Sequence, residues 1–121
     1  MSGQEVLVVC PPASGDTLAR LLEEHWRVYP VRSVTEALEH LMSYRTSVVI
    51  CESSLPDGTW RNLLESAPNL IVTARTTDET LWAEVLNLGG FDVLAQPFDE
   101  REVNRVVASA WRRTPECGDI S

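Results

Sequence analysis

The 121-residue sequence contains no lysine, because all ten of its basic residues are arginines. Lysine forms Schiff bases with carbonyl substrates, and it is an essential part of the Gly-Lys-Ser/Thr phosphate-binding loop. The sequence therefore excludes both kinds of site. Its 18 acidic residues give a net charge of −8, and such a surface repels nucleic-acid phosphates. Direct binding of nucleic acid is not expected.

Cysteine motifs and long apolar runs are also missing. The three cysteines are odd in number and include no Cys-x-x-Cys spacing, which is typical of a reducing compartment. No apolar stretch approaches the ~20 residues that a membrane helix needs, and the first residues do not resemble a signal peptide. We therefore expect a soluble, cytoplasmic protein that makes no membrane contact, with a single domain.

Five short apolar segments alternate with segments whose apolar residues have helical spacing. The predicted strands are residues 6–10, 28–31, 47–51, 69–74 and 91–95. This alternation predicts an α/β fold in which a parallel sheet is covered by helices on both faces. Pro30 lacks a backbone donor, so the second strand is expected at an edge of the sheet.

Capping signals predict where the helices begin and end. Ser14 or Asp16 is expected to cap the first helix, and Ser33-Val34-Thr35-Glu36 has the capping-box pattern that precedes a second. Asp99 is expected to cap the last helix. Gly89-Gly90 is expected to end the fourth helix with a residue in the left-handed conformation.

The ends of the predicted strands indicate where a functional site would lie. In a parallel sheet, ligands bind in a crevice beyond the carboxyl ends of the strands. The residues at those ends are Cys10-Pro11, Glu52, Thr73 and Gln96. The crevice is therefore expected to hold a single carboxylate, and neither a metal site nor a basic residue.

The order of these elements, together with four loop motifs, resembles the receiver domain of bacterial response regulators, a CheY-like family. The motifs are Leu55-Pro56, Thr73-Ala74, Gly89-Gly90 and Pro97-Phe98. The resemblance covers residues 1–113 and implies a flavodoxin-like, doubly wound (βα)5 sandwich of three layers with strand order 2-1-3-4-5. It also implies a cis Gln96–Pro97 bond. Residues 114–121 are expected to form a flexible tail or the start of a linker.

The family's reactive residues are replaced at the matching positions of this sequence. The aspartate that accepts a phosphoryl group corresponds to Glu52, and the acidic pair that holds Mg²⁺ corresponds to Cys10 and Pro11. The lysine that pairs with the phosphoryl oxygens corresponds to Gln96. Thr73 keeps the family's hydroxyl. Cysteine and proline do not supply the oxygen ligands that Mg²⁺ requires, so no cofactor and no metal-dependent phosphorylation are expected.

Two further positions bear on signalling. The aromatic switch residue of the family's fifth strand corresponds to Val93, which has no ring. Asp57 follows the loop proline, and an Asp-Gly pair at this place is typical of a turn rather than of a phosphoacceptor. Glu52 either mimics the phosphorylated state or is a remnant of a lost site. Gln96 is a candidate hydrogen-bond donor to Glu52 or Thr73.

The remaining polar and aromatic residues suggest no catalysis. His25 and His40 are expected at the surface. Cys51 precedes Glu52 and should point to the opposite face of the sheet, so a redox pair with Cys10 is not expected. Trp82 gives the fourth helix extra apolar surface, which belongs either to a partner contact or to the core.

The sequence thus favours an atypical receiver domain of bacterial two-component, phosphorelay-type signalling that is not an enzyme. It would act independently of phosphorylation, through a signalling partner or a homodimer. The expected contact face consists of the fourth helix, the fifth strand and the fifth helix. Two alternatives remain: a small thiol enzyme that uses Cys10 as nucleophile, and the input half of a longer regulator.

Overall fold

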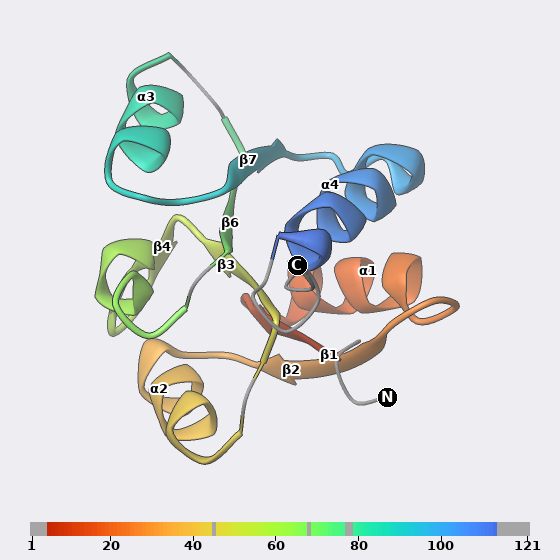
Figure 1. The fold of residues 1–121 in the computed structure, drawn as a ribbon, viewed down its shortest axis with the longest axis horizontal. Coiled ribbons are helices and arrows are strands. Elements are labelled where there is room, and N and C mark those ends of the chain that lie inside the picture. Colours follow the sequence, from red (N-terminus) through yellow and green to blue (C-terminus); the bar gives the residue numbers. More distant parts are fainter. Residues whose placement is uncertain (1–4, 45, 68, 77–78, 114–121) are drawn as a thin grey trace.

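A computed structural model describes residues 5–44, 46–67, 69–76 and 79–113 (Figure 1). Its main sheet has five strands in the order β2-β1-β3-β6-β7, and all neighbouring strands are parallel. The strands are β1 (Glu5–Val9), β2 (Arg27–Val31), β3 (Val48–Glu52), β6 (Leu70–Ala74) and β7 (Asp92–Ala95). Because β6 and β7 are the fourth and fifth strands of this sheet along the chain, the predicted order 2-1-3-4-5 is confirmed.

Helices cover both faces of the sheet and give the three layers that the sequence predicts (Figure 1). One face carries α1 (Pro12–Leu22) and α4 (Glu100–Arg112). The other carries α2 (Val34–Ser43), a 3-10 helix η2 (Trp60–Leu63) and α3 (Glu79–Asn87). None of the helices in the described part of the chain is long and apolar enough to cross a membrane.

The central strands are buried on both faces, which explains their unbroken apolar sequence. In β1, Val6 and Val8 pack against the α1 and α4 side, whereas Leu7 and Val9 pack against the α2 side. By contrast, β2 is an edge strand with exposed residues, as Pro30 predicts.

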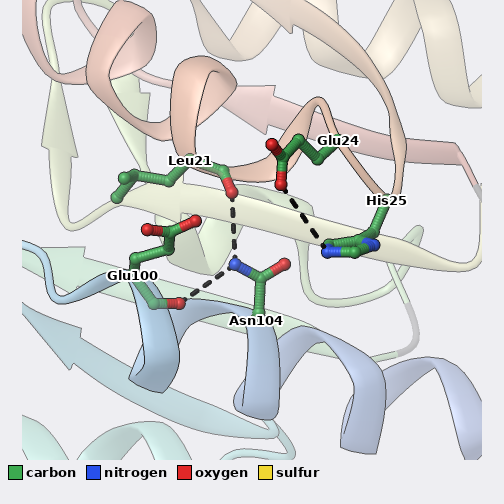
Figure 2. Close-up of polar contacts among 5 residues, drawn as sticks. All are labelled: Leu21, Glu24, His25, Glu100 and Asn104. Carbon is green, nitrogen blue, oxygen red and sulfur yellow. Dashed lines mark hydrogen bonds and ion pairs between the residues drawn. The ribbon is translucent and has the colours of Figure 1, made fainter.

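Contacts between α1 and α4 connect the first and last helices of the sheet's one face. Nδ2 of Asn104 on α4 donates to the carbonyl of Leu21 at 3.1 Å and to that of Glu100 at 3.0 Å (Figure 2). Beside this contact, the rings of Trp26 and Trp111 meet edge to face with centroids 6.1 Å apart. Side chains from opposite ends of the sequence therefore close this face of the sheet.

The loop after β3 contains a small hairpin that the sequence pattern did not predict. Strands β4 (Ser54–Leu55) and β5 (Gly58–Thr59) pair antiparallel around Pro56 and Asp57. The helix predicted next is a single 3-10 turn, capped by the side chain of Thr59.

One predicted helix start is wrong. The first helix begins at Pro12, with Pro11 at the N-cap position, so Ser14 and Asp16 lie inside it. Pro12 suits the first helical position, because its fixed φ fits the first turn and it has no N–H to leave unpaired. The caps predicted at Ser33 and Asp99 are confirmed.

Two further predictions concern the ends of elements. Gly89 has a φ of 107° and ends α3 as predicted, and the Gln96–Pro97 bond is cis. The predicted tail, residues 114–121, and Cys117 lie outside the described residues.

The prediction that both histidines are exposed holds for His25 but is wrong for His40. His25 is exposed, whereas His40 is only 6% exposed. The His40 ring is buried because it lies between the rings of Tyr29 and Tyr44, with centroid distances of 4.2 and 4.8 Å. This arrangement joins the edge strand β2 to the end of α2.

Candidate functional site

The carboxylate of Glu52 lies at the end of β3, where two other elements meet it. Oε1 of Glu52 accepts a hydrogen bond from Oγ of Ser14 at 3.1 Å and another from Nε2 of Gln96 at 3.4 Å. The donor expected at Gln96 is therefore confirmed. One carboxylate oxygen thus connects the first turn of α1, the end of β3 and the segment after β7.

Ser14 is the residue of this site that sequence reasoning missed. It was assigned to helix capping, a role that Pro11 and Pro12 make unnecessary by starting α1 earlier. The double proline was the available signal, because proline is favoured in the first turn of a helix and so places Ser14 inside it. Its hydroxyl is then free to bind Glu52.

Thr73 faces Glu52 across the β3–β6 pair but is closed off from solvent. The two residues are register partners, and the backbone N–H of Ser53 donates to the Thr73 carbonyl at 2.8 Å. The Thr73 side chain is completely buried, beside the Cys10 thiol. An incoming group therefore reaches this hydroxyl only if the crevice opens.

The Cys10 thiol lies under the same crevice and is poorly suited to act as a nucleophile. Cys10 is 2% exposed. Burial, and secondly the negative charge of Glu52, raise the pKa of the Cys10 thiol to about 12. Because the thiolate is the reactive form, almost all of this cysteine is unreactive at neutral pH.

Cys10 and Cys51 lie on opposite faces of the sheet, as predicted. Cys10 belongs to the core under α1 and α4, whereas Cys51 belongs to the core under α2, η2 and α3. Burial also raises the pKa of the Cys51 thiol. The sheet therefore separates the two sulfur atoms, and the geometry does not support a redox pair.

Asp57 caps α2 and does not face the Glu52 crevice. Its Oδ1 accepts the Val34 N–H at 2.9 Å, and its Oδ2 accepts the N–H and the Oγ1 hydroxyl of Thr35 at 3.0 and 2.8 Å. These hydrogen bonds, with that of Val34 the largest, lower the pKa of the Asp57 carboxyl. All the strong donors around this carboxylate thus come from the start of a helix.

The α3 side of the molecule combines a buried Val93 with exposed apolar side chains. Val93 is 8% exposed and packs in the core beneath this helix. Trp82, Leu86 and Leu88 are 50%, 40% and 50% exposed, so Trp82 does not extend the core. A salt bridge between Arg61 and Glu84 connects η2 to α3.

Comparison with solved structures identifies the architecture. A receiver domain of a CheY-like response regulator from Methanospirillum hungatei superposes with a TM-score of 0.83 at 20% identity, covering 97% of this chain and 100% of that one. The receiver domain of a Francisella response regulator gives 0.83 at 19% identity, covering 92% and 98%. The chain has the receiver-domain fold.

Other comparisons are weaker or concern a different activity. A chain described as an adenylate cyclase from Rhodopirellula baltica has a TM-score of 0.83 at 19% identity, with 94% of this chain and 91% of that chain covered. A family model described as "Primase C terminal 1 (PriCT-1)" matches residues 71–116, which is less than half of the chain. No curated protein sequence matches this chain.

Within this receiver fold, the crevice differs from a metal site in its donor atoms. The positions at the end of β1 hold a buried thiol and a proline ring, and neither provides the carboxylate oxygens that Mg²⁺ prefers. In the described ranges, no three His, Cys, Asp or Glu side chains are grouped so that they could hold a metal ion. The residues present therefore do not fit Mg²⁺.

Proposed function

We propose that this chain is an atypical receiver domain of bacterial two-component signalling that works by protein–protein interaction and without phosphorylation. The observation that carries the proposal is the Glu52 carboxylate, which occupies the phosphoacceptor position and is hydrogen-bonded by Ser14 and Gln96. A carboxyl group thus stands at the position where a working receiver gains its phosphoryl group. The domain is a binding module and not an enzyme.

The chemistry of phosphoryl transfer supports this proposal. Transfer depends on positioning and on neutralisation of charge on the phosphoryl oxygens, by a metal ion and a cation. Cys10 and Pro11 stand in place of the metal ligands, and neutral Gln96 stands in place of the cation. Asp57, the other carboxylate of the loop, is occupied by the start of α2.

The proposed contact face consists of α3, β7 and α4, and its occupant is a signalling protein or a second copy of the chain. Support comes from three large exposed apolar side chains, Trp82 and Leu86 on α3 and Leu88 directly after it. Apolar side chains gathered on one surface element are typical of an interaction site. If the chain is the input half of a longer regulator, the same face is available to its output domain.

The hydrogen bonds to Glu52 favour a working role for this residue over the alternative of a remnant. A carboxylate held by donors from α1 and from the segment after β7 keeps these elements together in one arrangement. A free carboxylate on the surface would need no such donors. The burial and high pKa of Cys10 speak against the thiol-enzyme alternative.

The first test is incubation with acetyl phosphate and Mg²⁺, followed by intact-mass measurement and sedimentation velocity. We expect no phosphoryl adduct and the same sedimentation coefficient with and without the reagents. A stoichiometric adduct on Glu52 or Asp57 would refute phosphorylation independence.

The second test concerns the contact face. Photo-crosslinking from position 86, performed in cells, should capture a defined protein or a second copy of the chain, and the additional change Trp82→Ser should abolish the product. Crosslinking from Thr17, which is exposed on α1 and lies outside both proposed contact sites, is the control. Equal products from both positions would contradict the proposed face.

A further inference from the structure

A pocket of about 370 Å³ lies on the opposite edge of the sheet from β7, between β2 and α2. It is lined chiefly by Tyr29, Val31, Glu36, Glu39, His40 and Tyr44. We call it the β2–α2 pocket. None of these residues belongs to the Glu52 crevice or to the proposed α3–β7–α4 face.

Three aromatic rings form one wall of the β2–α2 pocket. His40 lies between Tyr29 and Tyr44, and the plane of its imidazole is inclined by 34° to the Tyr29 ring and by 29° to the Tyr44 ring. The imidazole is buried, whereas Tyr29 and Tyr44 are 45% and 61% exposed. The stack therefore fixes the orientation of two tyrosines while leaving ring surface available to a ligand.

Two glutamates line the pocket, and a third lies beside the stack. Glu36 and Glu39 stand on the pocket wall, and Oε1 of Glu36 is positioned by the N–H of Arg32 at 2.8 Å. Behind the stack, Oε1 of Glu5 lies 3.7 Å from Nε2 of His40, which forms no hydrogen bond. The carbonyl end of α2, capped at Tyr44, adds the negative pole of a helix dipole.

We propose that the β2–α2 pocket binds an arginine side chain of a partner protein. A guanidinium group is planar and always charged, so it stacks on a tyrosine ring while its fork of N–H groups binds a carboxylate. The pocket offers both features side by side. The charge of the whole chain, −8, also favours the approach of a basic segment.

Arginine fits this pocket better than the other cations. A metal ion needs several grouped ligands, and within the described residues no group of three His, Cys, Asp or Glu side chains could hold one. A lysine ammonium is a compact, strongly hydrated point charge that gains less from a flat aromatic wall. The proposal is independent of phosphorylation and of the α3–β7–α4 face, so either can fail alone.

The test uses three capped tripeptides, acetyl-Gly-X-Gly-amide, in which X is arginine, citrulline or lysine. Citrulline has nearly the shape of arginine but no charge. Titration into ¹⁵N-labelled protein should give saturable shifts of the amides of Tyr29, His40 and Tyr44 with the arginine peptide. The citrulline peptide should give none, and the lysine peptide should bind more weakly.

Two variants test the contributions of the tyrosine ring and of the carboxylate to binding. Tyr44→Leu and Glu39→Gln should each weaken arginine-peptide binding about two- to fivefold, the effect of one exposed cation–π or charge contact. Glu23→Gln removes the same charge from the C-cap of α1 and should change nothing. Circular dichroism checks that the variants fold.

The proposal is overturned by equal shifts with arginine and citrulline, by equal binding of arginine and lysine, or by shifts confined to α3 and α4. Loss of binding in Glu23→Gln equal to that in Glu39→Gln would also overturn it, because the attraction would then be a property of net charge alone.

Discussion

Glu52 ends β3 and Asp57 lies in the hairpin loop that follows, and the partners of the two carboxylates lie on opposite sides of the sheet. Glu52 is bound by Ser14 of α1 and by Gln96, whereas Asp57 is bound by the first residues of α2. The loop after β3 is thus held from both faces. Both carboxylates therefore already accept hydrogen bonds from elements of the fold.

The substitution Asp57→Ala should lower the free energy of unfolding at neutral pH, because it removes the acceptor of three hydrogen bonds at the start of α2. The pKa of Asp57 is lowered in the folded state. Its stabilisation is therefore complete above the unfolded-state pKa, near 4, and is lost as the pH falls through the lower folded-state pKa.

Urea unfolding of both proteins from about pH 7 down to about pH 2 measures this difference. The gap in stability between wild type and Asp57→Ala should close toward the acid end. Asp16→Ala removes an exposed carboxylate from within α1 and serves as the control. A gap of constant size at all pH values would show that the Asp57 charge has no part in capping α2.

Cys10 should resist alkylation in the native state. Burial and the charge of Glu52 raise the pKa of its thiol to about 12, so the thiolate is scarce at pH 7. Iodoacetamide labelling, mapped by peptide mass, should modify Cys10 only at the rate at which the protein unfolds, and quickly in urea. Full native labelling within minutes at pH 7 would revive the thiol-enzyme alternative.

At the scale of elements, the sequence predicted most of the framework, and the failures have physical causes. Buried parallel strands give unbroken apolar runs, and capping side chains such as Asp99 are local signals, so both were found. The early start of α1 escapes the pattern because Ser14, two residues beyond the prolines, is itself a favoured N-cap residue. The β4–β5 hairpin is too short to give a periodic pattern.

The sequence pattern did not predict contacts between side chains of different elements. His40 is polar and lies in the last turn of α2, so the sequence favours exposure. It is buried because Tyr44, the C-cap of the same helix, and Tyr29, on the edge strand β2, stack on its two sides. The crevice residues at the strand ends could be grouped from topology alone. Their hydrogen bonds could not, except that of Gln96, whose amide suits a carboxylate.

The glycine that ends α3 offers a test of an element boundary. Gly89 has a φ of 107°, and a Cβ added there would meet no atom within 4 Å. Gly89→Ala should therefore cost about 1–2 kcal/mol of unfolding free energy from backbone strain alone, without any clash.

Gly15 provides the matched control for this substitution. It lies inside α1, where an added Cβ would make ordinary contacts at 3.6 Å or more. Gly15→Ala should stabilise the protein by about 0.5–1 kcal/mol, because alanine favours the helix. Equilibrium unfolding in urea measures both. A loss of stability in Gly15→Ala equal to that in Gly89→Ala would contradict the assigned backbone conformations.

At the scale of the whole molecule, the two halves of the chain share one sheet. The segment 71–116, which matches a primase family model, includes most of β6 and all of β7, but β6 pairs with β3 from the other half. Asn104 on α4 binds the carbonyl of Leu21 on α1 (Figure 2). The described part of this segment, residues 71–76 and 79–113, therefore packs into the same core as the first half of the chain.

Because the core is intact around the crevice, substitutions confined to the crevice should be able to restore phosphorylation. The variant Cys10→Asp, Pro11→Asp, Glu52→Asp and Gln96→Lys replaces the metal ligands, the acceptor and the cation together. We expect Mg²⁺-dependent phosphorylation by acetyl phosphate in this variant only, because these groups act as a unit and single changes do not add up. Intact mass measures the product.

Stability gives a second readout of the same variant. It places three carboxylates together, one of them at the buried position of Cys10, and Glu52→Asp shortens the side chain that Ser14 and Gln96 now hold. Without Mg²⁺ the variant should therefore unfold at a lower urea concentration than the parent, and Mg²⁺ should restore part of the loss. The parent should show no such dependence on Mg²⁺.

Phosphorylation of this variant should still be poorly relayed to α3 and α4, because Val93 has no ring to change position and packs in the core. Sedimentation is measured with and without acetyl phosphate, for the variant with and without the further change Val93→Tyr. A change in self-association that needs Val93→Tyr would show that phosphorylation alone does not alter the α3 and α4 surface. A folded variant that binds Mg²⁺ but is not phosphorylated would show that residues outside these four positions prevent the reaction. The β4–β5 hairpin, held on α2 by Asp57, would then be the next element to change.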